Sequence, residues 1–385
     1  MKFIHTSDWH LGRILHGKHL TEDQFYILQQ FIYIIKNENP DAILIAGDLY
    51  DRSVPPVEAV ELLDNVFTKI LIDFNIPIIC ISGNHDSPDR INFGSKLLQE
   101  RKLFIKGKFD LNFAPITLED NYGKVNFYTI PYTEPVVIKA LLKEENIHNH
   151  NDAIKSVIDK IKCNLNYNER NVLVCHAFVT GGEESESERP LSVGGASSVD
   201  YNNFECFNYT ALGHLHRPQK CTKENIKYSG SLMKYSFSEV NQEKCIYIIE
   251  MDEKGEISTK QVCLKPKRDL RYIEGHLKDI INDAAEDENR EDYLLVNLLD
   301  EGAILDPIGK LRQVYPNVLR IDREDLKKEI NKEIVLPDKN FNNMSHIKLF
   351  KSFYTQVTGK EFLEDKEQVL EDLLKEYYSE KGVSK

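Results

Sequence analysis

The sequence lacks the features that mark several common classes of protein. Its 7 cysteines are scattered and form no CxxC pair, so neither a disulfide framework nor a structural zinc site is expected. No apolar run approaches the about 18 residues that a membrane-spanning helix needs. The N-terminal stretch "MKFIHTSDWH" turns polar after 4 residues, which is not the pattern of a secretory signal peptide. These absences predict a protein of the reducing cytoplasm.

The chain also lacks the basic excess that a simple DNA-binding module usually carries. It has 49 Lys and Arg against 62 Asp and Glu, which gives a formal net charge of −13 over 385 residues. This charge does not exclude an enzyme of nucleic acids, because bound divalent cations and a basic partner can supply positive charge. The acidic residues concentrate between Arg271 and Glu301.

Short apolar strings that end in polar residues predict strands buried on both faces. They are "KFIHTSD", "AILIAGD", "PIICISGNHD", "NVLVCHA" and "YTALGHLH". Helical segments separate the early strands, which predicts an α/β core. In the first of them, "TEDQFYILQQFIYIIK", we expect Thr21 and Gln24 to form a capping box. We expect its apolar stripe to consist of Phe25, Leu28, Ile32 and Ile35.

The composition changes near "KPKRDL" (265–270) and again near "LPDKNFNN" (336–343). We therefore predict a main domain over 1–265, a small α+β domain over 266–337 and a helical region over 338–385. The last region contains two amphipathic helices, whose apolar faces either pack on their own domain or fill a groove of a partner. Those faces consist of Ile347, Phe350, Phe353, Tyr354 and Val357, with Gly359 as a C-cap, and of Val369, Leu370, Leu373, Leu374 and Tyr377.

The five predicted strands are each followed by side chains that can bind metals. Ligands bind at the carboxyl ends of strands in open α/β sheets, and His, Asp and Asn without cysteine suit Mn²⁺, Fe²⁺ or Zn²⁺ in a binuclear site. The glycines before Asp48, Asn84 and His214 fit turns that need small residues. The "GHLH" histidines would share one face of an extended strand, so they could bind one metal or two. The candidates are Asp8, His10, Asp48, Asp51, Asn84, His85, Asp86, His176, His214 and His216.

The ordered set DxH, GDxxD, GNHD, H and GHxH resembles the calcineurin-like metallophosphoesterase superfamily. That resemblance implies a four-layer α/β sandwich of two packed mixed sheets flanked by helices. The longer strings "HTSDWHLGR", "LTEDQ", "GDLYDR", "SGNHDSPDRINFGS", "SESERPLSVGG", "ALGHLHRPQ" and "YSGSLMKYSFSE" resemble its bacterial DNA-nuclease branch. With "YPNVLRID" and the helical tail, the similarity extends over essentially the whole chain.

The resemblance implies the roles of the site residues. Asp8, His10 and His216 would bind a first metal, Asn84, His176 and His214 a second, and Asp48 both. Two cations about 3.5–4 Å apart would clamp a phosphodiester and hold the attacking hydroxide. His85 would contact the phosphate and protonate the leaving oxygen, with a purely structural role as its alternative. The metals are expected to be Mn²⁺, with Fe²⁺ or Zn²⁺ possible.

The resemblance also implies an activity and partners. It implies a 3′→5′ exonuclease on double-stranded DNA and an endonuclease on single-stranded or hairpin DNA, associated with the nucleoid. The partner would be an ABC-type coiled-coil ATPase held by the C-terminal helices, in a heterotetramer that contains a homodimer of this chain. The small domain would cap the cleft and help to position DNA. The alternative functions are a phosphomonoesterase, a cyclic-nucleotide phosphodiesterase or a catalytically silent scaffold.

Some residues near the motifs are ambiguous. Asp51 stands where other branches of the nuclease family have a histidine, and we expect it to orient a metal-ligating histidine. "GRILHGKH" nearly matches a P-loop, but His19 stands in place of the hydroxyl and no strand precedes it. The acidic loop 180–195 is expected to rim the cleft. Arg13, Arg52, Arg90, Arg189 and Arg217 contact either DNA phosphates or acidic side chains, while His148, His150, His276 and His346 are expected at the surface.

Overall fold

A computed structural model describes residues 1–188, 191, 198–302, 304–323, 346–358, 362 and 364–381. The chain divides into two compact units, Met1–Arg271 and Tyr272–Lys385. The second break of the sequence, at 336–343, lies outside the described residues, as do Arg189 and Gly359.

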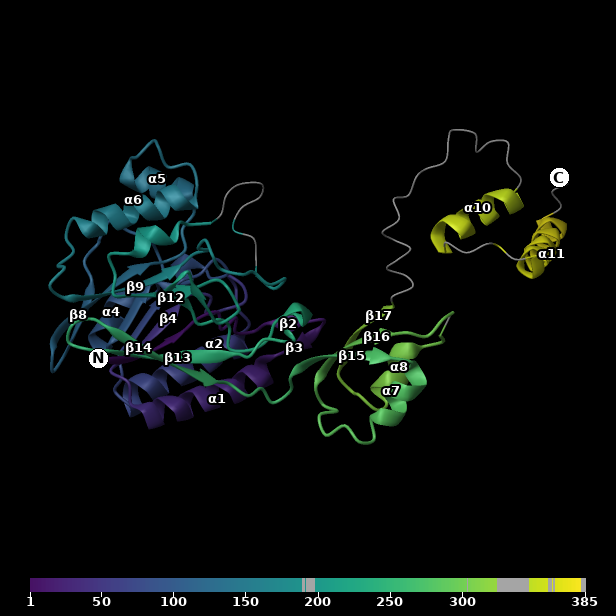
Figure 1. The fold of residues 1–385 in the computed structure, drawn as a ribbon, viewed down its shortest axis with the longest axis horizontal. Coiled ribbons are helices and arrows are strands. Elements are labelled where there is room, and N and C mark those ends of the chain that lie inside the picture. The colour runs from purple at the N-terminus through teal and green to yellow at the C-terminus, as the bar shows by residue number, and fades with distance from the viewer. Residues whose placement is uncertain are drawn as a thin grey trace. The chain divides into compact units, whose positions relative to one another are not determined.

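The first unit contains two six-stranded sheets that pack face to face (Figure 1). One sheet has the order β14-β13-β1-β4-β5-β6, and the other has the order β11-β12-β10-β9-β8-β7. Parallel strands occupy the middle of both sheets. The strands of the first sheet are β1 Lys2–Thr6, β4 Ala42–Ala46, β5 Ile78–Ile81, β6 Leu103–Lys106, β13 Cys245–Met251 and β14 Ile257–Cys263. Those of the second sheet are β7 Ile116–Asp120, β8 Gly123–Ile130, β9 Arg170–His176, β10 Tyr209–Gly213, β11 Gln219–Cys221 and β12 Lys223–Tyr228.

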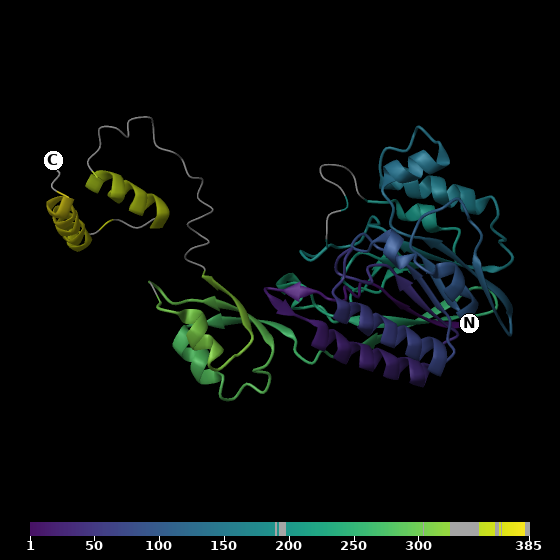
Figure 2. The same cartoon turned by 180° about the vertical axis from the view of Figure 1, so that it is seen from behind.

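Apolar residues hold the two sheets together and attach helices to their outer faces. Phe3, Leu44 and Ile79 of one sheet pack against residues such as Phe127 and Val174 of the other. Helices α1 (Thr21–Glu38) and α2 (Val57–Thr68) lie outside the first sheet, and α5 (Pro135–Leu142) and α6 (His150–Lys162) lie outside the second (Figures 1 and 2). The expected four-layer α/β sandwich is therefore confirmed.

The details of α1 differ from the expectation. Its N-cap is Leu20, which makes no side-chain cap hydrogen bond, so the predicted capping box of Thr21 and Gln24 is wrong. Gln24 is buried, whereas Phe25 is 52% exposed and does not belong to the buried stripe. The P-loop-like string instead forms a short hairpin of β2 (Ile14–Leu15) and β3 (Lys18–His19). Short helices also follow β5, namely α3 (Pro88–Ile91) and α4 (Ser95–Leu98).

The second unit begins with a small α+β module. Its three-stranded sheet has the order β15-β16-β17, with β15 Leu270–Gly275, β16 Tyr293–Leu298 and β17 Val318–Arg323. Helices α7 (Leu277–Asp283) and α8 (Pro307–Arg312) pack on it through a core that includes Leu294, Val296 and Leu311. The sequence patterns did not predict β15, which begins at the last residue of the linker expected over 265–270.

Two further helices follow, α10 (His346–Thr358) and α11 (Glu364–Lys381). Phe362 lies between them and contacts the rings of Phe350 and Tyr354. Part of the expected apolar faces remains open, because Phe353 and Val369 are 61% and 60% exposed. Among the described residues, no helix combines the length and the apolar character needed to cross a membrane.

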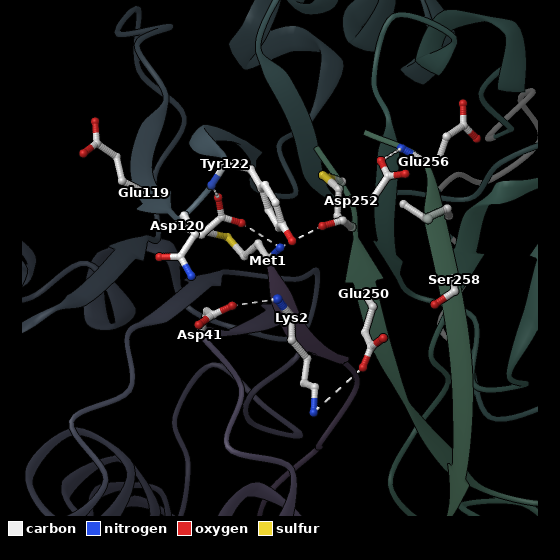
Figure 3. Close-up of a pocket in the computed structure, with 13 residues that line it drawn as sticks. Met1, Lys2, Asp41, Glu119, Asp120, Tyr122, Glu250, Asp252, Glu256 and Ser258 are labelled. Carbon is white, nitrogen blue, oxygen red and sulfur yellow. Dashed lines mark hydrogen bonds and ion pairs between the residues drawn. The ribbon is translucent and has the colours of Figure 1, made fainter. Parts of the chain in front are cut away.

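A partly buried ion cluster lies at the amino end of β1, where Figure 3 shows Met1 beside Asp120. The carboxylate of Asp120 lies 2.7 Å from the Met1 ammonium. The same carboxylate accepts two hydrogen bonds from the Arg170 guanidinium. Since Met1 precedes a strand of one sheet and the other two residues belong to the second sheet, this cluster joins the sheets.

Candidate metal centre

Every candidate ligand lies at or just beyond the carboxyl end of a strand. The strands β1, β4 and β5 are neighbours in one sheet, and β9 and β10 are neighbours in the other. Because parallel strands end at the same edge of a sheet, the side chains gather at one end of the sandwich. Asp8 and His10 follow β1, Asp48 and Asp51 follow β4, Asn84 and His85 follow β5, His176 closes β9, and His214 and His216 follow β10.

Several of these residues have a left-handed backbone, which side chains other than glycine rarely adopt. The φ angles are 52° at Asp8, 46° at His10, 50° at Asp48 and 111° at His214. Such conformations cost free energy and concentrate at functional sites. The strain at His214 also shows that "GHLH" is not an extended strand. The premise that its two histidines share one face of a strand is therefore wrong.

Glycines allow the loops to approach one another closely. A Cβ atom on Gly213 would clash with the carbonyl oxygen of Ala46, which belongs to the other sheet. A Cβ atom on Gly83 would clash with the carboxylate of Asp48. The glycines before His214 and Asn84 are therefore required by contacts between the loops, as well as by the turns.

The first cluster brings together Asp8, His10 and His216. Their ligand atoms lie within 4.8 Å of one another, and the Nε2 atoms of His10 and His216 are 3.0 Å apart. An oxygen of Asp48 lies 3.7 Å from His10 Nε2. Two imidazoles and two carboxylates thus converge on one point, which is the donor set that a divalent transition metal prefers.

The second cluster is centred on His176. Its Nε2 atom lies 2.9 Å from Asn84 Oδ1 and 3.6 Å from Asp48 Oδ2. The ring of His214 is 5.6 Å from the ring of His176, and His214 Nε2 is buried without a hydrogen-bond partner. An unpaired buried nitrogen is costly, and a metal ion would satisfy it. Asp48 is close to both clusters.

The electrostatics of the centre also fit bound cations. Burial above all, and also the nearby Asp48 carboxylate, raises the pKa of Asp8 to about 6. Burial, and then the neighbouring histidines, lowers the pKa of His10 and of His214 well below the ordinary value. The metal-free site therefore combines the neutral imidazoles of His10 and His214 with buried carboxylates that have little positive charge near them. Divalent ions at the two clusters would supply that charge.

His85 and Asp51 lie beside the first cluster. The ring nitrogen Nδ1 of His85 is 2.8 Å from the backbone oxygen of Asp51, and its amide donates to Asp48 at 2.8 Å. The Asp51 carboxylate accepts a hydrogen bond from Arg13 at 2.7 Å, and it lies 3.8 Å from His10 Nδ1. That last distance is too long for a hydrogen bond. Arg13 is thus engaged with an acidic side chain.

Asp86 is a structural residue of the centre that the motif analysis left without a role. Its carboxylate accepts hydrogen bonds from the amides of Leu49 and Tyr50 at 3.1 and 3.0 Å. It also accepts one from the amide of Gly83 at 3.0 Å. The loop that carries Asp48 is thereby joined to the loop that carries Asn84 and His85. Burial, and then Asp48, raises the pKa of Asp86 to about 7.

Other buried groups that support the centre also escaped the sequence analysis. Gln24 donates to the backbone oxygen of His10 at 2.8 Å and accepts from the amide of Gly12 at 3.0 Å. Ser187 and Glu239 lie behind His216. These residues lie in stretches that resemble the family, namely "LTEDQ", "SESERPLSVGG" and "YSGSLMKYSFSE". Their spacing in the sequence matches no known ligand or catalytic motif, so the sequence alone did not assign them a function.

The remaining ambiguous residues can now be placed. His150 is only 8% exposed and stacks on Tyr132, so its expected surface position is wrong. His16 and His19 are exposed in the hairpin. Arg217 forms an ion pair with Glu183. The described part of the acidic loop packs behind His216 through Ser187 and Glu188.

Comparisons with known proteins agree with this geometry. Residues 1–218 match the family model described as calcineurin-like phosphoesterase. Residues 266–358 match a model named SbcD_C and described as type 5 capsule protein repressor C-terminal domain. A curated relative, the SbcD subunit of nuclease SbcCD from Staphylococcus epidermidis, is 41% identical over 321 residues, which are 83% of this chain and 85% of the relative.

Solved structures show only a distant likeness. A Thermus thermophilus protein and a dimetal phosphatase from Danio rerio are each 12% identical with a TM-score of 0.36. Each comparison covers 68% of this chain and 98% of the other. A likeness this weak supports no argument about the site.

The chain belongs to the calcineurin-like phosphoesterase family. It is thus a metal-dependent phosphoester hydrolase with a site for two divalent metal ions. Within that family it is a homologue of SbcD, a subunit of the SbcCD nuclease.

Proposed function

We propose that this chain hydrolyses DNA phosphodiester bonds as the nuclease subunit of an SbcCD complex. The observation that carries the proposal is the convergence of His10 Nε2 and His216 Nε2 at 3.0 Å beside a second cluster around His176. Exonuclease action from 3′ to 5′ on double-stranded ends, and endonuclease action on single strands and hairpins, follow from the resemblance to the nuclease branch.

Each metal would be held by three residues of its own and by one residue that the two metals share. Asp8, His10 and His216 would hold the first, Asn84, His176 and His214 the second, and Asp48 would bind both. When bound, two divalent cations polarise a phosphodiester and activate a water at neutral pH. We propose Mn²⁺ as the metal, because the donors are imidazole and oxygen without thiolate, although the same set accepts Fe²⁺ and Zn²⁺.

His85 is the proposed proton donor. Because Nδ1 of its ring contacts the backbone oxygen of Asp51 at 2.8 Å, it must carry a hydrogen in that contact. The other nitrogen, Nε2, is then the atom left to exchange a proton with the leaving oxygen. The bond from the His85 amide to Asp48 fixes the ring next to the metal ligands.

Cleavage assays with different substrates test the activity. The purified chain, with and without SbcC, should cleave linear DNA only when Mn²⁺ is present. The alternative is a phosphomonoesterase or a cyclic-nucleotide phosphodiesterase, and p-nitrophenyl phosphate compounds would report either. If these compounds are hydrolysed and DNA is not, the nuclease proposal is wrong. If excess Mn²⁺ leaves the chain without bound metal, the catalytically silent scaffold is favoured instead.

We also propose that the C-terminal helices bind SbcC, an ABC-type ATPase with a coiled coil. Phe353 on α10 and Val369 and Leu373 on α11 are more than half exposed, which leaves apolar surface for a partner. A chain that ends after Pro337 should lose SbcC in a pull-down and keep both metals. Retention of SbcC by the shortened chain would contradict the docking site.

A homodimer within a heterotetramer is the proposed assembly. Phe93 and Leu97 support it, because they are 85% and 79% exposed on the segment that follows the metal-site loop of β5. A second copy of the chain would cover this apolar pair.

An enzyme of this kind would act on chromosomal DNA at the nucleoid. There the acidic module after residue 266 would help to position DNA next to a basic partner.

A further inference from the structure

His216 is backed by a chain of buried hydrogen bonds that we call the Glu239 relay, formed by Ser187, Glu239 and Lys244. The ring nitrogen Nδ1 of His216 lies 2.6 Å from Ser187 Oγ. The Ser187 hydroxyl donates to Glu239 Oε1, and Glu239 Oε2 lies 2.7 Å from the Lys244 ammonium. All these residues are less than 9% exposed. The relay is therefore part of the interior, shielded from water.

The charges at the end of the relay fix the direction of each hydrogen bond. A lysine ammonium only donates and a carboxylate only accepts. Ser187 must therefore donate its hydrogen to Glu239, which leaves its oxygen to accept from His216. Consequently Nδ1 of His216 carries a hydrogen, and in the neutral ring Nε2 has the free lone pair. Nε2 is the atom that lies 3.0 Å from His10 Nε2 in the first cluster.

The second cluster is supported differently. Nδ1 of His176 lies 2.8 Å from the backbone oxygen of Ala46, which is a neutral acceptor. A carboxylate behind a metal-ligating histidine makes the ligand more basic and orients its ring, and a neutral carbonyl does so less strongly. The two clusters thus differ in the charge that stands behind a ligand.

The relay is also connected to the backbone around His216. Lys244 donates to the backbone oxygen of His216 at 2.7 Å, and Glu188 accepts from its amide at 2.8 Å. Glu239 in turn accepts from the amide of Tyr235 at 3.1 Å. The segments "SESER" and "YSFSE", which are part of the family resemblance, therefore pack together next to His216.

We propose that Glu239 is a positioning residue that acts on His216, through Ser187 and through its own contact with Nδ1 at 3.4 Å, to set the affinity of the first metal relative to the second. The inference rests on the metal assignment of the proposed function. Glutamine at position 239 could donate as well as accept, so the hydrogen on His216 would no longer be held at Nδ1. Loss of such an outer partner typically weakens metal binding about 10- to 100-fold.

Metal titration of the full chain tests the inference directly. Equilibrium dialysis against increasing Mn²⁺, with bound metal counted, should show two metals in the wild type. In Glu239→Gln one site should weaken about 10- to 100-fold, and the other should not change. Glu243→Gln is the matched control, because Glu243 is exposed and lies outside the relay. Equal weakening of both sites, or no weakening, would overturn the inference.

Further variants separate positioning from folding. Glu239→Gln leaves the buried Lys244 without its partner, which can itself destabilise the protein. The double variant Glu239→Gln with Lys244→Met removes both charges, and it should fold yet keep the weakened site. Ser187→Ala should show the same defect, and Ser187→Thr, which restores a hydroxyl, should recover the affinity. Recovery in the double variant would mean that the relay is only structural. A wild type that binds no metal would instead refute the proposed function.

Discussion

The single residues of the metal centre are arranged before any metal binds. Asp8 and His214 both have strained backbones, and such strain costs about 1–3 kcal/mol at each position. The strain persists because the two residues hold each other. The carboxylate of Asp8 accepts the amide hydrogen of His214, with its two oxygens at 3.0 and 3.1 Å. Since Asp8 belongs to the first proposed metal site and His214 to the second, this bond couples their geometry.

Replacement of His85 tests its proposed role as proton donor. His85→Gln should lower DNA cleavage by about 10²- to 10⁴-fold and leave both metals bound. Glutamine can still donate to the backbone oxygen of Asp51 but cannot release a proton at neutral pH. Cleavage rates and metal counts of the same preparation measure the two effects, with exposed His16→Gln as the control. Loss of both metals in His85→Gln would show that the residue supports the site instead of the reaction.

The raised pKa of Asp8 predicts that metal affinity depends on pH. Because burial and Asp48 raise this pKa to about 6, the metal-free protein keeps a proton on Asp8 below that pH. The pKa of His216, a second proposed ligand of the same metal, is also raised. Burial lowers this pKa, but the hydrogen bond and charge of Glu239 outweigh the effect of burial. Metal must displace these protons, so affinity should fall by roughly tenfold per pH unit for each proton displaced. Mn²⁺ titrations at about pH 5, 6 and 7.5 would measure this fall, and a constant affinity would contradict it.

At the scale of elements, the first turn of α1 supports the loop that carries His10. Gln24 bonds to Gly12, to His10 and to the Tyr235 hydroxyl. Gln24→Ala would leave buried polar groups unpaired, which should lower the free energy of unfolding by about 3 kcal/mol. Denaturant unfolding measures the loss, and Gln29→Ala on the exposed face of the same helix is the control. Equal stability of the two variants would show that the loop does not need Gln24.

The same helix shows what sequence patterns could and could not predict. Apolar runs and the polar residues that follow them predicted β1, β4, β5, β9 and β10 and the side chains that gather at their carboxyl ends. They failed for Gln24, because a polar residue three positions after Thr21 is typical of a capping box. Only the folded chain shows that its partners come from the β1 loop and from Tyr235, more than 200 positions away. The Glu239 relay escaped for the same reason, since Ser187 and Glu239 are 52 positions apart.

At the scale of the whole molecule, the two sheets are joined at the end opposite to the metal centre by Asp120 (Figure 3). Hydrogen bonds from Arg170 hold the pKa of Asp120 well below its ordinary value, against the effect of burial and with help from the Met1 ammonium. A lowered pKa stabilises the fold above the unfolded value of about 3.9, and this contribution declines as the pH falls toward the lower folded value. Asp120→Asn should therefore cost about 2–3 kcal/mol near pH 7, and the difference from wild type should shrink below about pH 4.

Denaturant unfolding of the wild type and of Asp120→Asn over this pH range measures both effects. Glu119→Gln is the matched control, because Glu119 is exposed beside Asp120 on the same strand. A difference between Asp120→Asn and wild type that stays constant down to about pH 3 would mean that the cluster stabilises the sandwich by packing and not by charge. Because the metal loops leave the opposite ends of these strands, metal counts in Asp120→Asn should equal those of the wild type wherever the variant is folded.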